Sequence, residues 1–539
     1  MSRETFAVTS NFRRSALVTA VALISAGVAS AGTLNGQVLG AGAPIANSNV
    51  TLWGANAGAP KELAQARSGA DGRFTMTFAD AAAAGTSMYL VAQRGQPTAN
   101  KASADNPRIA LLAALGTKVP ATVTINELST VASVWTHNQL IDGANIKGQP
   151  LQLKIAAGNV RSFVDLATGG YGGVLQDPLN SGQTPTLANF ATLANALAGC
   201  VTQVKADSCS ALFKASQGPT GAAPGDTLAA AQAIARSPWY QPQRIFALLD
   251  AFYPVPQGKN LRPAPYAPYL QFSPSAWVLP LKFDGGGYRA GGKAMFDAEG
   301  NLWVGNNFTV GWQANDALWQ GNASKFDPNG KPLSPITTGF TGGGMEGGTF
   351  GAAIDLKGNV WLSAYGSKAI AIFDKDGKPL TPPEGINFGG RLGLMQGIIT
   401  APNGDMWALG VSKRQLLHFP KGDWKNGRIV CEGDSAEPCK SFTAPFHLAI
   451  DQQDRIWVSD SSFHVIRFPA SDPSKAVKLD VRSNNSGLNI DSQGNVWTAN
   501  RFGSSVEAKL KQDELMANYA LRGEKAATES TTGDAAAKE

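Results

Sequence analysis

The chain has 539 residues, of which 16% are charged and 60 are glycine, and its formal net charge is +6. This length predicts two or three domains, and the abundance of glycine favours turn-rich β structure. The positive charge is small, and no basic stripe interleaved with aromatic residues is present, so we expect no nucleic-acid partner.

The first 31 residues have the pattern of a secretory signal peptide. An apolar run from Ala16 to Val28 follows three arginines and precedes the small residues Ala29-Ser30-Ala31. We expect cleavage after Ala31 and a periplasmic or extracellular protein, with the general or the twin-arginine export route left open by Arg13-Arg14. No later segment is long and apolar enough to predict a membrane span.

Residues 32–98 are predicted to form a small β-sandwich. Short runs of alternating apolar residues are separated by turn signals such as Asp71-Gly72. The order of Gly36-Gln37-Val38, Val50-Thr51-Leu52 and Asp71-Gly72-Arg73-Phe74 resembles the transthyretin-like, carboxypeptidase-regulatory-like modules of immunoglobulin type. In that family the module is an accessory domain, and the resemblance implies no site residue here.

Residues 104–253 are predicted to form a helical domain. A helix start at 124–128 is followed by Val131, Val134 and Trp135 at helical spacing. Three further helical stretches are 188–204, 228–235 and 244–252. A proline-rich linker at 254–274 follows. The four cysteines form two close pairs, and in an exported chain this spacing predicts the disulfides Cys200–Cys209 and Cys431–Cys439.

A repeated phrase organises residues 275–508. Its clearest copies read Asp297-Ala298-Glu299-Gly300-Asn301-Leu302-Trp303 and Asp355-Leu356-Lys357-Gly358-Asn359-Val360-Trp361. Aspartate and glycine favour a tight turn, and the flanking apolar residues favour two strands. Five such copies predict a β-propeller, in which the tryptophan of each copy packs between blades. The tryptophans are Trp303, Trp361, Trp407, Trp457 and Trp497.

The number of blades is open between five and six, because the interval between Trp303 and Trp361 is 58 residues long. The last copy is followed by little strand-like sequence, so we expect 276–283 to supply an outer strand that closes the ring. Residues 509–539 are predicted to be a charged tail that is partly disordered. The overall prediction is a multidomain protein with a β-sandwich, a helical domain and a propeller.

The five copies resemble the NHL-repeat and streptogramin-lyase-like propellers of secreted bacterial proteins. Such propellers host binding, lyase and lactonase functions, so the resemblance implies a fold more than an activity. It implies a site at the mouth of the central channel, formed by the loops that precede each inner strand. From these loops we predict six ligand-binding residues, which are Arg289, Met345, Arg391, Gln396, Phe446 and Asn485. Tyr288 and Lys293 also belong to the first loop.

The resemblance to streptogramin lyases also gives catalytic candidates. In those enzymes a histidine acts as the proton-transfer base beside an acidic residue and magnesium, and His447 followed by Asp460 is similar, with Glu346 as a further acid. A second axial histidine is missing. The leading hypothesis is therefore an exported binding or structural platform for an unknown small molecule, peptide or glycan. The alternative is a lyase or lactone hydrolase that uses magnesium or calcium, with no metal ligand assigned.

Overall fold

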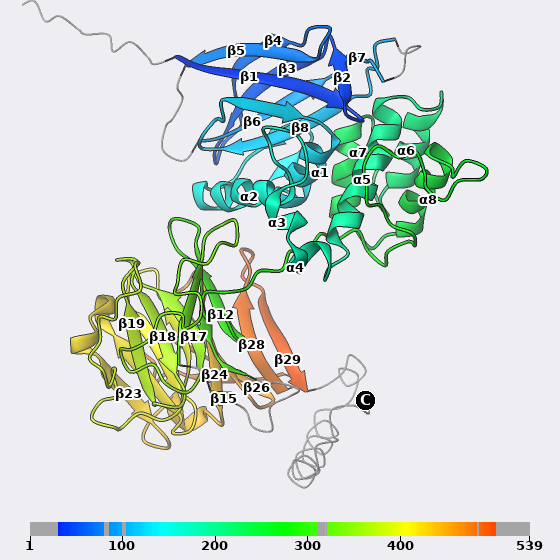
Figure 1. The fold of residues 1–539 in the computed structure, drawn as a ribbon. Coiled ribbons are helices and arrows are strands. Elements are labelled where there is room, and N and C mark those ends of the chain that lie inside the picture. Colours follow the sequence, from blue (N-terminus) through cyan, green and yellow to red (C-terminus); the bar gives the residue numbers. More distant parts are fainter. Residues whose placement is uncertain are drawn as a thin grey trace, which may run out of the picture.

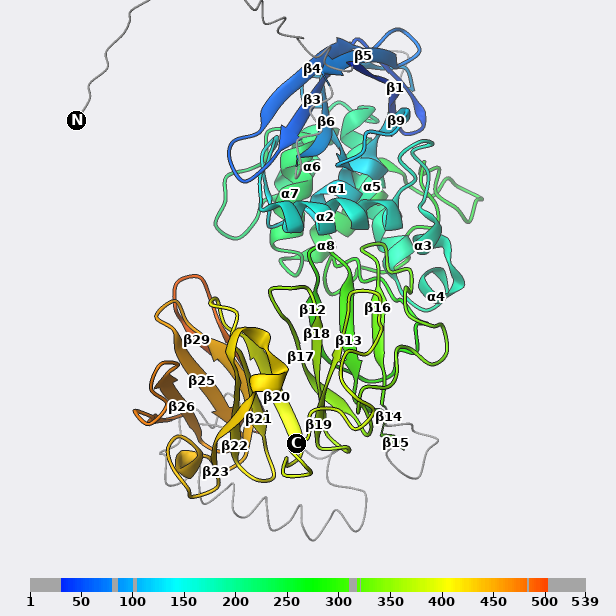
Figure 2. The ribbon, with the colours of Figure 1, turned by 90° about the vertical axis from the view of Figure 1, so that its left-hand side faces the viewer.

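The computed structural model describes residues 31–79, 86–99, 104–309, 318–319, 321–481 and 484–502. A β-sandwich, a layer of helices and a set of antiparallel sheets follow one another along the chain (Figures 1 and 2). The predicted signal peptide and the predicted tail at 509–539 lie outside the described residues. None of the described helices has the length and apolar character that a bilayer span requires.

The N-terminal unit consists of two sheets packed face to face. One sheet has the order β5-β1-β2-β7 with β9 parallel to β1, and the other has the order β4-β3-β6-β8. Strand β5 shows why they pack, because its buried residues alternate with exposed ones. The two sheets include β8 and β9, which lie beyond the expected boundary at residue 98. The strands are β1 Ala31–Gly40, β2 Ala43–Ala46, β3 Asn49–Ala55, β4 Lys61–Arg67, β5 Arg73–Ala79, β6 Ser87–Gln93, β7 Gln96–Pro97, β8 Ala110–Gly116 and β9 Thr122–Ile125.

The helices share one hydrophobic core with the sandwich rather than forming a separate domain core. Four of them, α2, α3, α4 and α6, lie outside the stretches that have helical spacing in the sequence. A short hairpin of β10 Ile141–Asp142 and β11 Asn145–Ile146 connects the first two helices. The helices are α1 Glu127–Thr136, α2 Pro150–Phe163, α3 Gly173–Gln176, α4 Pro178–Ser181, α5 Thr186–Val201, α6 Ser208–Ser216, α7 Thr227–Arg236 and α8 Pro242–Phe252.

Helix side chains cover the free edge of strand β8. The hydroxyls of Thr130 and Ser133 on α1 accept hydrogen bonds from the backbone N–H groups of Leu112 and Ala114, both at 2.9 Å. Thr227 at the start of α7 bonds both the N–H and the C=O of Ala110. An uncovered edge strand would expose unpaired backbone groups, so these hydroxyls fasten the sandwich to the helices.

The segment 276–283 does not form the outer strand that we expected. The indole of Trp277 is buried in the core of the helices, and its N–H donates to the carbonyl of Pro242. Asn189 and Asn180 bond the backbone of Val278 and Lys282. The prediction that this segment closes the ring is therefore wrong, because its large apolar residue is held by the helices instead.

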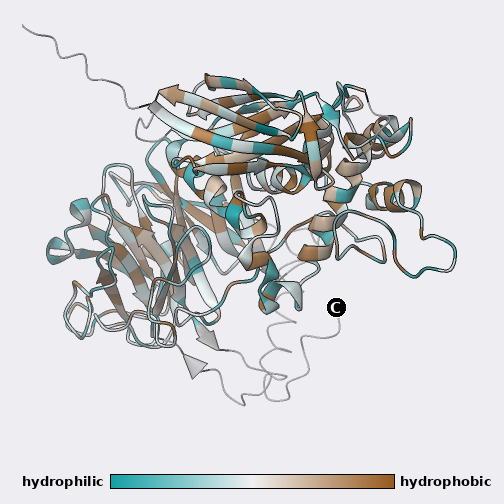
Figure 3. Ribbon diagram, turned by 45° about the horizontal axis from the view of Figure 1, so that its top comes forward, coloured by the Kyte–Doolittle hydropathy of each residue, from teal (hydrophilic) through white to brown (hydrophobic). Residues whose placement is uncertain are grey.

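Both predicted disulfides are present. Cys200–Cys209 joins the end of α5 to α6, and Cys431–Cys439 joins β23 Arg428–Glu432 to the short 3-10 helix η3 Cys439–Ser441. Hydrophobic residues lie mainly within strands and helices, and the connecting loops are more hydrophilic (Figure 3). Apolar strands and helices therefore alternate with polar connecting loops in the sandwich, in the helices and in the C-terminal sheets.

The C-terminal half forms one antiparallel sheet for each copy of the repeat. The first strand of each sheet is the inner strand, and inner strands of consecutive copies lie next to one another. The long interval before the second copy contains the small β14–β15 hairpin. The first sheet consists of β12 Gly291–Phe296, β13 Leu302–Asn306 and β16 Ala323–Phe326, and the second of β17 Thr349–Ile354, β18 Val360–Ala364 and β19 Ala369–Phe373. The third consists of β20 Met395–Thr400, β21 Met406–Gly410, β22 Gln415–Phe419 and β23, and the fourth of β24 Pro445–Ile450, β25 Arg455–Asp460, β26 His464–Pro469 and β27 Val477–Asp480. The fifth consists of β28 Asn484–Ile490 and β29 Val496–Phe502, and the small hairpin consists of β14 Phe308–Thr309 and β15 Leu318–Trp319.

The repeated tryptophans are buried except at the end of the series. Trp303, Trp361 and Trp407 are at most 2% exposed, as an inter-blade position requires. Trp457 is half-buried, and Trp497 is 66% exposed. The expectation of inter-blade burial is wrong for Trp497, which lies in the last sheet of the series.

The helices lie against one end of the propeller-type unit. Gly158 of α2 is so close to Pro328 that an added Cβ would lie 2.6 Å from the proline side chain. Pro328 belongs to a turn in the first sheet, and the loops that precede the inner strands lie at the opposite end of these strands. The mouth predicted from the sequence therefore faces away from the helices (Figures 1 and 2).

Candidate functional site

Every inner strand contains an irregularity near its beginning. The register of each with its neighbour shifts by one residue before regular pairing resumes. A β-bulge of this kind bends the strand and re-aims a side chain, and bulges are frequent beside functional sites. The residues inside these shifts are 292–293, 350–351, 396–397, 446 and 486.

In each copy, one position lies four residues before the residue that opens the turn, which is aspartate in four copies and Ala401 in the third. This position holds glycine in three copies, which are Gly351, Gly397 and Gly487. A Cβ on Gly351 would lie 2.1 Å from the carbonyl oxygen of Gln396 on the next inner strand. Glycine at this position therefore lets neighbouring inner strands approach each other closely. The first and fourth copies depart from this rule, because they hold Lys293 and His447.

The pKa values of His447 and Lys293 are both lowered by burial. Burial lowers the pKa of His447 to about 4, and the positive charge of Lys293 acts in the same direction. A hydrogen bond to the backbone of Leu488 opposes both effects. Burial also lowers the pKa of Lys293 to about 8. At neutral pH the imidazole is therefore uncharged, and the amine titrates close to neutrality.

Buried polar atoms without hydrogen-bond partners gather on the inner strands. Among the described residues, such atoms occur at or beside the shifts on β17, β20, β24 and β28. Buried polar groups in proteins are normally bonded, so each of these atoms is available to a ligand or to water. They are Thr349 Oγ1, Gln396 Oε1, His447 Nδ1, Asn485 Oδ1 and Ser486 Oγ.

Two phenylalanines meet across the unit at the same level. The rings of Phe350 on β17 and Phe446 on β24 are 5.8 Å apart and steeply inclined, although β20 lies between these strands in the series. Tyr365 also contacts Phe350, with ring centroids 5.7 Å apart. These half-buried rings provide an apolar wall beside the unpaired polar atoms.

The three predicted catalytic residues have different surroundings. His447 lies on β24 with its backbone N–H bonded to Ser459. The carboxylate of Asp460 accepts hydrogen bonds from the backbone N–H groups of Thr443 and Ala444 at 2.6–3.0 Å, which occupies it in shaping the loop before β24. Glu346 is exposed in its loop. Within the described ranges, no group of three or more His, Cys, Asp or Glu side chains is arranged to hold a metal ion.

The glycine-rich loop at 342–348 is held by backbone hydrogen bonds. The carbonyls of Glu346, Gly347 and Gly348 accept from the N–H groups of residues 367, 366 and 365. Gly344 has a φ of +84° and its Cβ position is filled by the backbone of Gly385, so a side chain would not fit there. The loop is a fixed part of the mouth and places Glu346 at its rim.

The six predicted ligand-binding residues fall into three groups. Gln396, Phe446 and Asn485 were expected in the loops before the inner strands, but they lie within the first residues of the strands themselves, where the register shifts. Arg289 and Arg391 are exposed in the preceding loops, whereas Met345 is buried in a core with Trp303. Thr349, Phe350 and Ser486 were not selected from the sequence. Their distance before the repeated turn residue is the signal that identifies them, because it matches that of the selected residues.

Comparison with known proteins gives similarity to solved structures alone. No family model matches the chain, and no curated protein matches it. A virginiamycin B lyase from Staphylococcus aureus, solved as an inactive variant with quinupristin, is 16% identical over 39% of this chain with a TM-score of 0.29, and the chain spans 62% of its length. A gluconolactonase from Xanthomonas campestris is 16% identical over 41% of this chain and 73% of its own, with a TM-score of 0.30. A chain of a nidogen/laminin complex is 14% identical over 39% of this chain and 72% of its own, with a TM-score of 0.30.

Proposed function

We propose that this protein is an exported binding platform that holds a small molecule, peptide or glycan at the mouth of its propeller-type unit. The observation that carries the proposal is the group of buried, unpaired polar atoms on four neighbouring inner strands. Leaving a buried polar atom unbonded costs about 1–3 kcal/mol, so a ligand that bonds several of them would recover that energy.

The kinds of residue at the mouth also support binding. The inner strands carry the unpaired atoms and the aromatic wall, and the preceding loops carry the exposed Arg289, Glu346 and Arg391. A buried polar and aromatic centre inside a charged rim is the usual construction of a ligand site. The three loop residues would then contact the outer part of a larger ligand.

A metal-dependent lyase or lactone hydrolase fits the residues less well. Such a site needs several convergent carboxylate or imidazole ligands, whereas Asp460 is occupied by backbone N–H groups. Lys293 beside His447 would also repel a cation. The residues around the axis therefore do not fit a magnesium or calcium ion, and we derive no catalytic step through one.

The proposal is tested by screening the full mature chain against small molecules, peptides and glycans with thermal shift and ligand-observed NMR. Hits are then measured against the variants His447→Ala and His464→Ala. His464 is the matched control, because it lies at the same end of the fourth sheet but bonds Asp480 at 3.2 Å.

Axial binding predicts that His447→Ala weakens each hit by at least about tenfold, equivalent to about 1.4 kcal/mol. The His464→Ala variant is expected to keep the affinity of the wild type. Equal affinities for all three proteins would place the ligand elsewhere and contradict the proposal. A folded protein that binds nothing from the three classes would contradict it as well.

A further inference from the structure

A cavity lies at the junction between the helices and the segment that leads into the propeller-type unit. Its walls are the end of α1, the second half of α2 and residues 279–283, and we call it the junction cavity. Its volume is about 310 Å³. Ligand sites commonly have volumes of about 300–1,000 Å³ and often lie where two structural units meet. The size and the place of the junction cavity are therefore those of a small-molecule site.

One wall of the junction cavity is an apolar face of the segment 278–284. Along this segment exposed residues alternate with half-buried ones, and the half-buried residues are Leu279, Leu281 and Phe283. In extended backbone every second side chain points to the same side. All three half-buried side chains line the cavity, whereas Val278 on the other face is 48% exposed. The segment therefore turns its apolar face toward the cavity and the helices.

Side chains of α4 and α5 fix the backbone of this segment. Asn180 accepts a hydrogen bond from the N–H of Lys282 at 2.7 Å and donates to the carbonyl of the same residue at 2.9 Å. Asn189 donates to the carbonyl of Val278 at 3.0 Å. These bonds hold both ends of the wall, so the junction cavity is preformed. A ligand that enters a preformed site does not have to order the chain around it.

Three aromatic rings line the junction cavity. The indole of Trp135 is half-buried, and its N–H already donates to the carbonyl of Trp277 at 2.9 Å. Phe163 is buried, and Phe283 packs over Gly330 in the turn after β16, where an added Cβ would collide with the ring. What these three side chains present to a ligand is therefore ring surface. Such surfaces pack well on another flat aromatic molecule by offset stacking or edge-to-face contact.

One polar atom of the lining is available to a ligand. The Nδ2 group of Asn159 donates to the carbonyl of Ile155 at 3.0 Å, and its Oδ1 atom has no hydrogen-bond partner among the described residues. The hydroxyl of Thr136, by contrast, donates to the carbonyl of Ala132 within α1. None of the lining residues in the described part of the chain is charged. The junction cavity therefore offers an amide oxygen that accepts a hydrogen bond from a neutral ligand.

The volume sets the size of the ligand. An apolar cavity of about 150 Å³ holds one benzene molecule. The junction cavity, at about 310 Å³, is large enough for two fused rings. A second cavity of about 280 Å³ also touches Phe283, but its lining includes Asp177, Lys282 and Asp284. A neutral aromatic molecule fits the junction cavity better, because it would leave those charged groups without a partner.

We propose that the junction cavity binds a small neutral molecule with two fused aromatic rings, such as an indole. Its rings pack among Trp135, Phe163 and Phe283, and its N–H or O–H group donates to Oδ1 of Asn159. The inference goes beyond the proposed function and does not rest on it, because the described lining residues lie on α1, α2 and the segment and none lies on an inner strand.

Indole and benzofuran are matched probes, because benzofuran has the same two-ring shape with an oxygen atom in place of the N–H group. Titration calorimetry with the full mature chain at pH 7 is expected to show indole binding about threefold to tenfold more tightly than benzofuran, owing to one hydrogen bond. Asn159→Leu is expected to remove this preference, since leucine keeps the volume and lacks the acceptor. Lys154→Leu is the matched control, because Lys154 is exposed on the same helix and does not line the cavity.

A pair of cavity-filling variants locates the site. Leu281→Trp places an indole group in the junction cavity and is expected to weaken indole binding at least about tenfold. Val278→Trp is its control, because Val278 lies on the exposed face of the same segment, and this variant is expected to keep the affinity of the wild type. Circular dichroism establishes that each variant is folded. If Leu281→Trp does not fold, the comparison of Asn159→Leu with Lys154→Leu decides the question.

The outcomes separate this inference from the proposed function. Equal binding of indole and benzofuran by the wild type would overturn the contact with Asn159 and the ligand class. Indole binding that is unchanged in Leu281→Trp and Asn159→Leu would overturn the site. Binding that is kept in Leu281→Trp but lost in His447→Ala would place indole at the mouth of the propeller-type unit, against this inference and in favour of the proposed function. Absence of indole binding at millimolar concentration would overturn the inference and leave the proposed function to its own screen.

Discussion

The indole N–H of Trp303 donates to a carboxylate oxygen of Asp297, six residues earlier, across 3.1 Å. The same bond joins Trp361 to Asp355 at 3.0 Å, and it recurs in the fourth and fifth copies. The other oxygen of Asp297 accepts two backbone N–H groups of the turn. One aspartate therefore shapes the turn and fixes the tryptophan on the neighbouring strand, which explains why both residues recur together.

The third copy lacks this bond, because Ala401 occupies the aspartate position and the buried indole N–H of Trp407 has no partner. We predict that Ala401→Asp stabilises the protein by about 1 kcal/mol by supplying an acceptor. The reverse change, Asp355→Ala, should destabilise it by about 1–3 kcal/mol because Trp361 then loses its acceptor. Chemical denaturation measures both, and a loss of stability in Ala401→Asp would contradict the role assigned to the aspartate.

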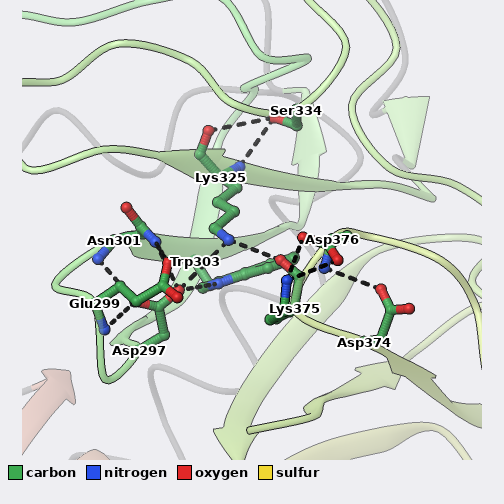
Figure 4. A network of polar contacts seen from close by, with 9 residues as sticks. All are labelled: Asp297, Glu299, Asn301, Trp303, Lys325, Ser334, Asp374, Lys375 and Asp376. Carbon is green, nitrogen blue, oxygen red and sulfur yellow. Dashed lines mark hydrogen bonds and ion pairs between the residues drawn. The ribbon is translucent and has the colours of Figure 1, made fainter.

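Lys325 lies opposite Trp303 in the sheet, at the register position that Ile372 occupies opposite Trp361. We predict that Lys325→Ile costs no more than about 1 kcal/mol, because an apolar residue of similar volume replaces a buried charge. Asp297→Ala should cost about 3 kcal/mol, since it leaves the ammonium group of Lys325 and the indole of Trp303 without this partner (Figure 4). Equilibrium unfolding in urea compares the two, and equal costs would argue against this asymmetry.

Gly351 lets two inner strands approach each other closely because it has no side chain. We predict that Gly351→Ala destabilises the protein by about 1–3 kcal/mol, because its methyl group would meet the carbonyl oxygen of Gln396. Gly173→Ala in α3 is the control, since an added Cβ there meets nothing within 4 Å and φ is not positive. The melting temperatures of both variants measure the difference, and an unchanged value for Gly351→Ala would mean that the inner strands can separate freely.

Glu127 is fully buried at the start of α1 and accepts hydrogen bonds from Tyr266 at 2.5 Å and from the backbone of Ala41. Burial raises its pKa from 4.5 to about 7. The folded state therefore binds the proton more tightly than the unfolded state, and this contribution to stability is present below pH 4.5 and is lost as the pH rises to 7. The loss is on the order of 3 kcal/mol.

The variant Glu127→Gln removes this titration while keeping an acceptor oxygen. Because burial lowers the pKa of His137 and His447, these two histidines destabilise the folded state as the pH falls below 6.5, opposite to Glu127. The informative quantity is therefore the difference in unfolding free energy between wild type and Glu127→Gln. We predict that the wild type loses stability relative to the variant between pH 4.5 and 7, and a constant difference would refute the buried, titrating carboxyl.

Local sequence patterns predicted the turns and paired strands of the C-terminal half. They also predicted both disulfides, one among the helices and one in the C-terminal half. Asp and Gly at set distances from Trp encode a hairpin, because the turn depends on backbone and side-chain groups within a few residues. The same spacing selected Gln396, Phe446, His447 and Asn485 as residues of the loops before the inner strands, whereas the structure places them in the first residues of those strands.

Long-range packing decided what the pattern could not. Trp277 reads as the start of a strand but is buried among helices, because the apolar core of α5 and α8 offers it more contact than an open sheet edge. Trp497 matches the repeat and is nevertheless exposed, since its burial depends on a neighbour that the local sequence does not specify. The closeness of Phe350 to Phe446 likewise depends on how the sheets are arranged around one another, and that arrangement is set by the tertiary structure as a whole.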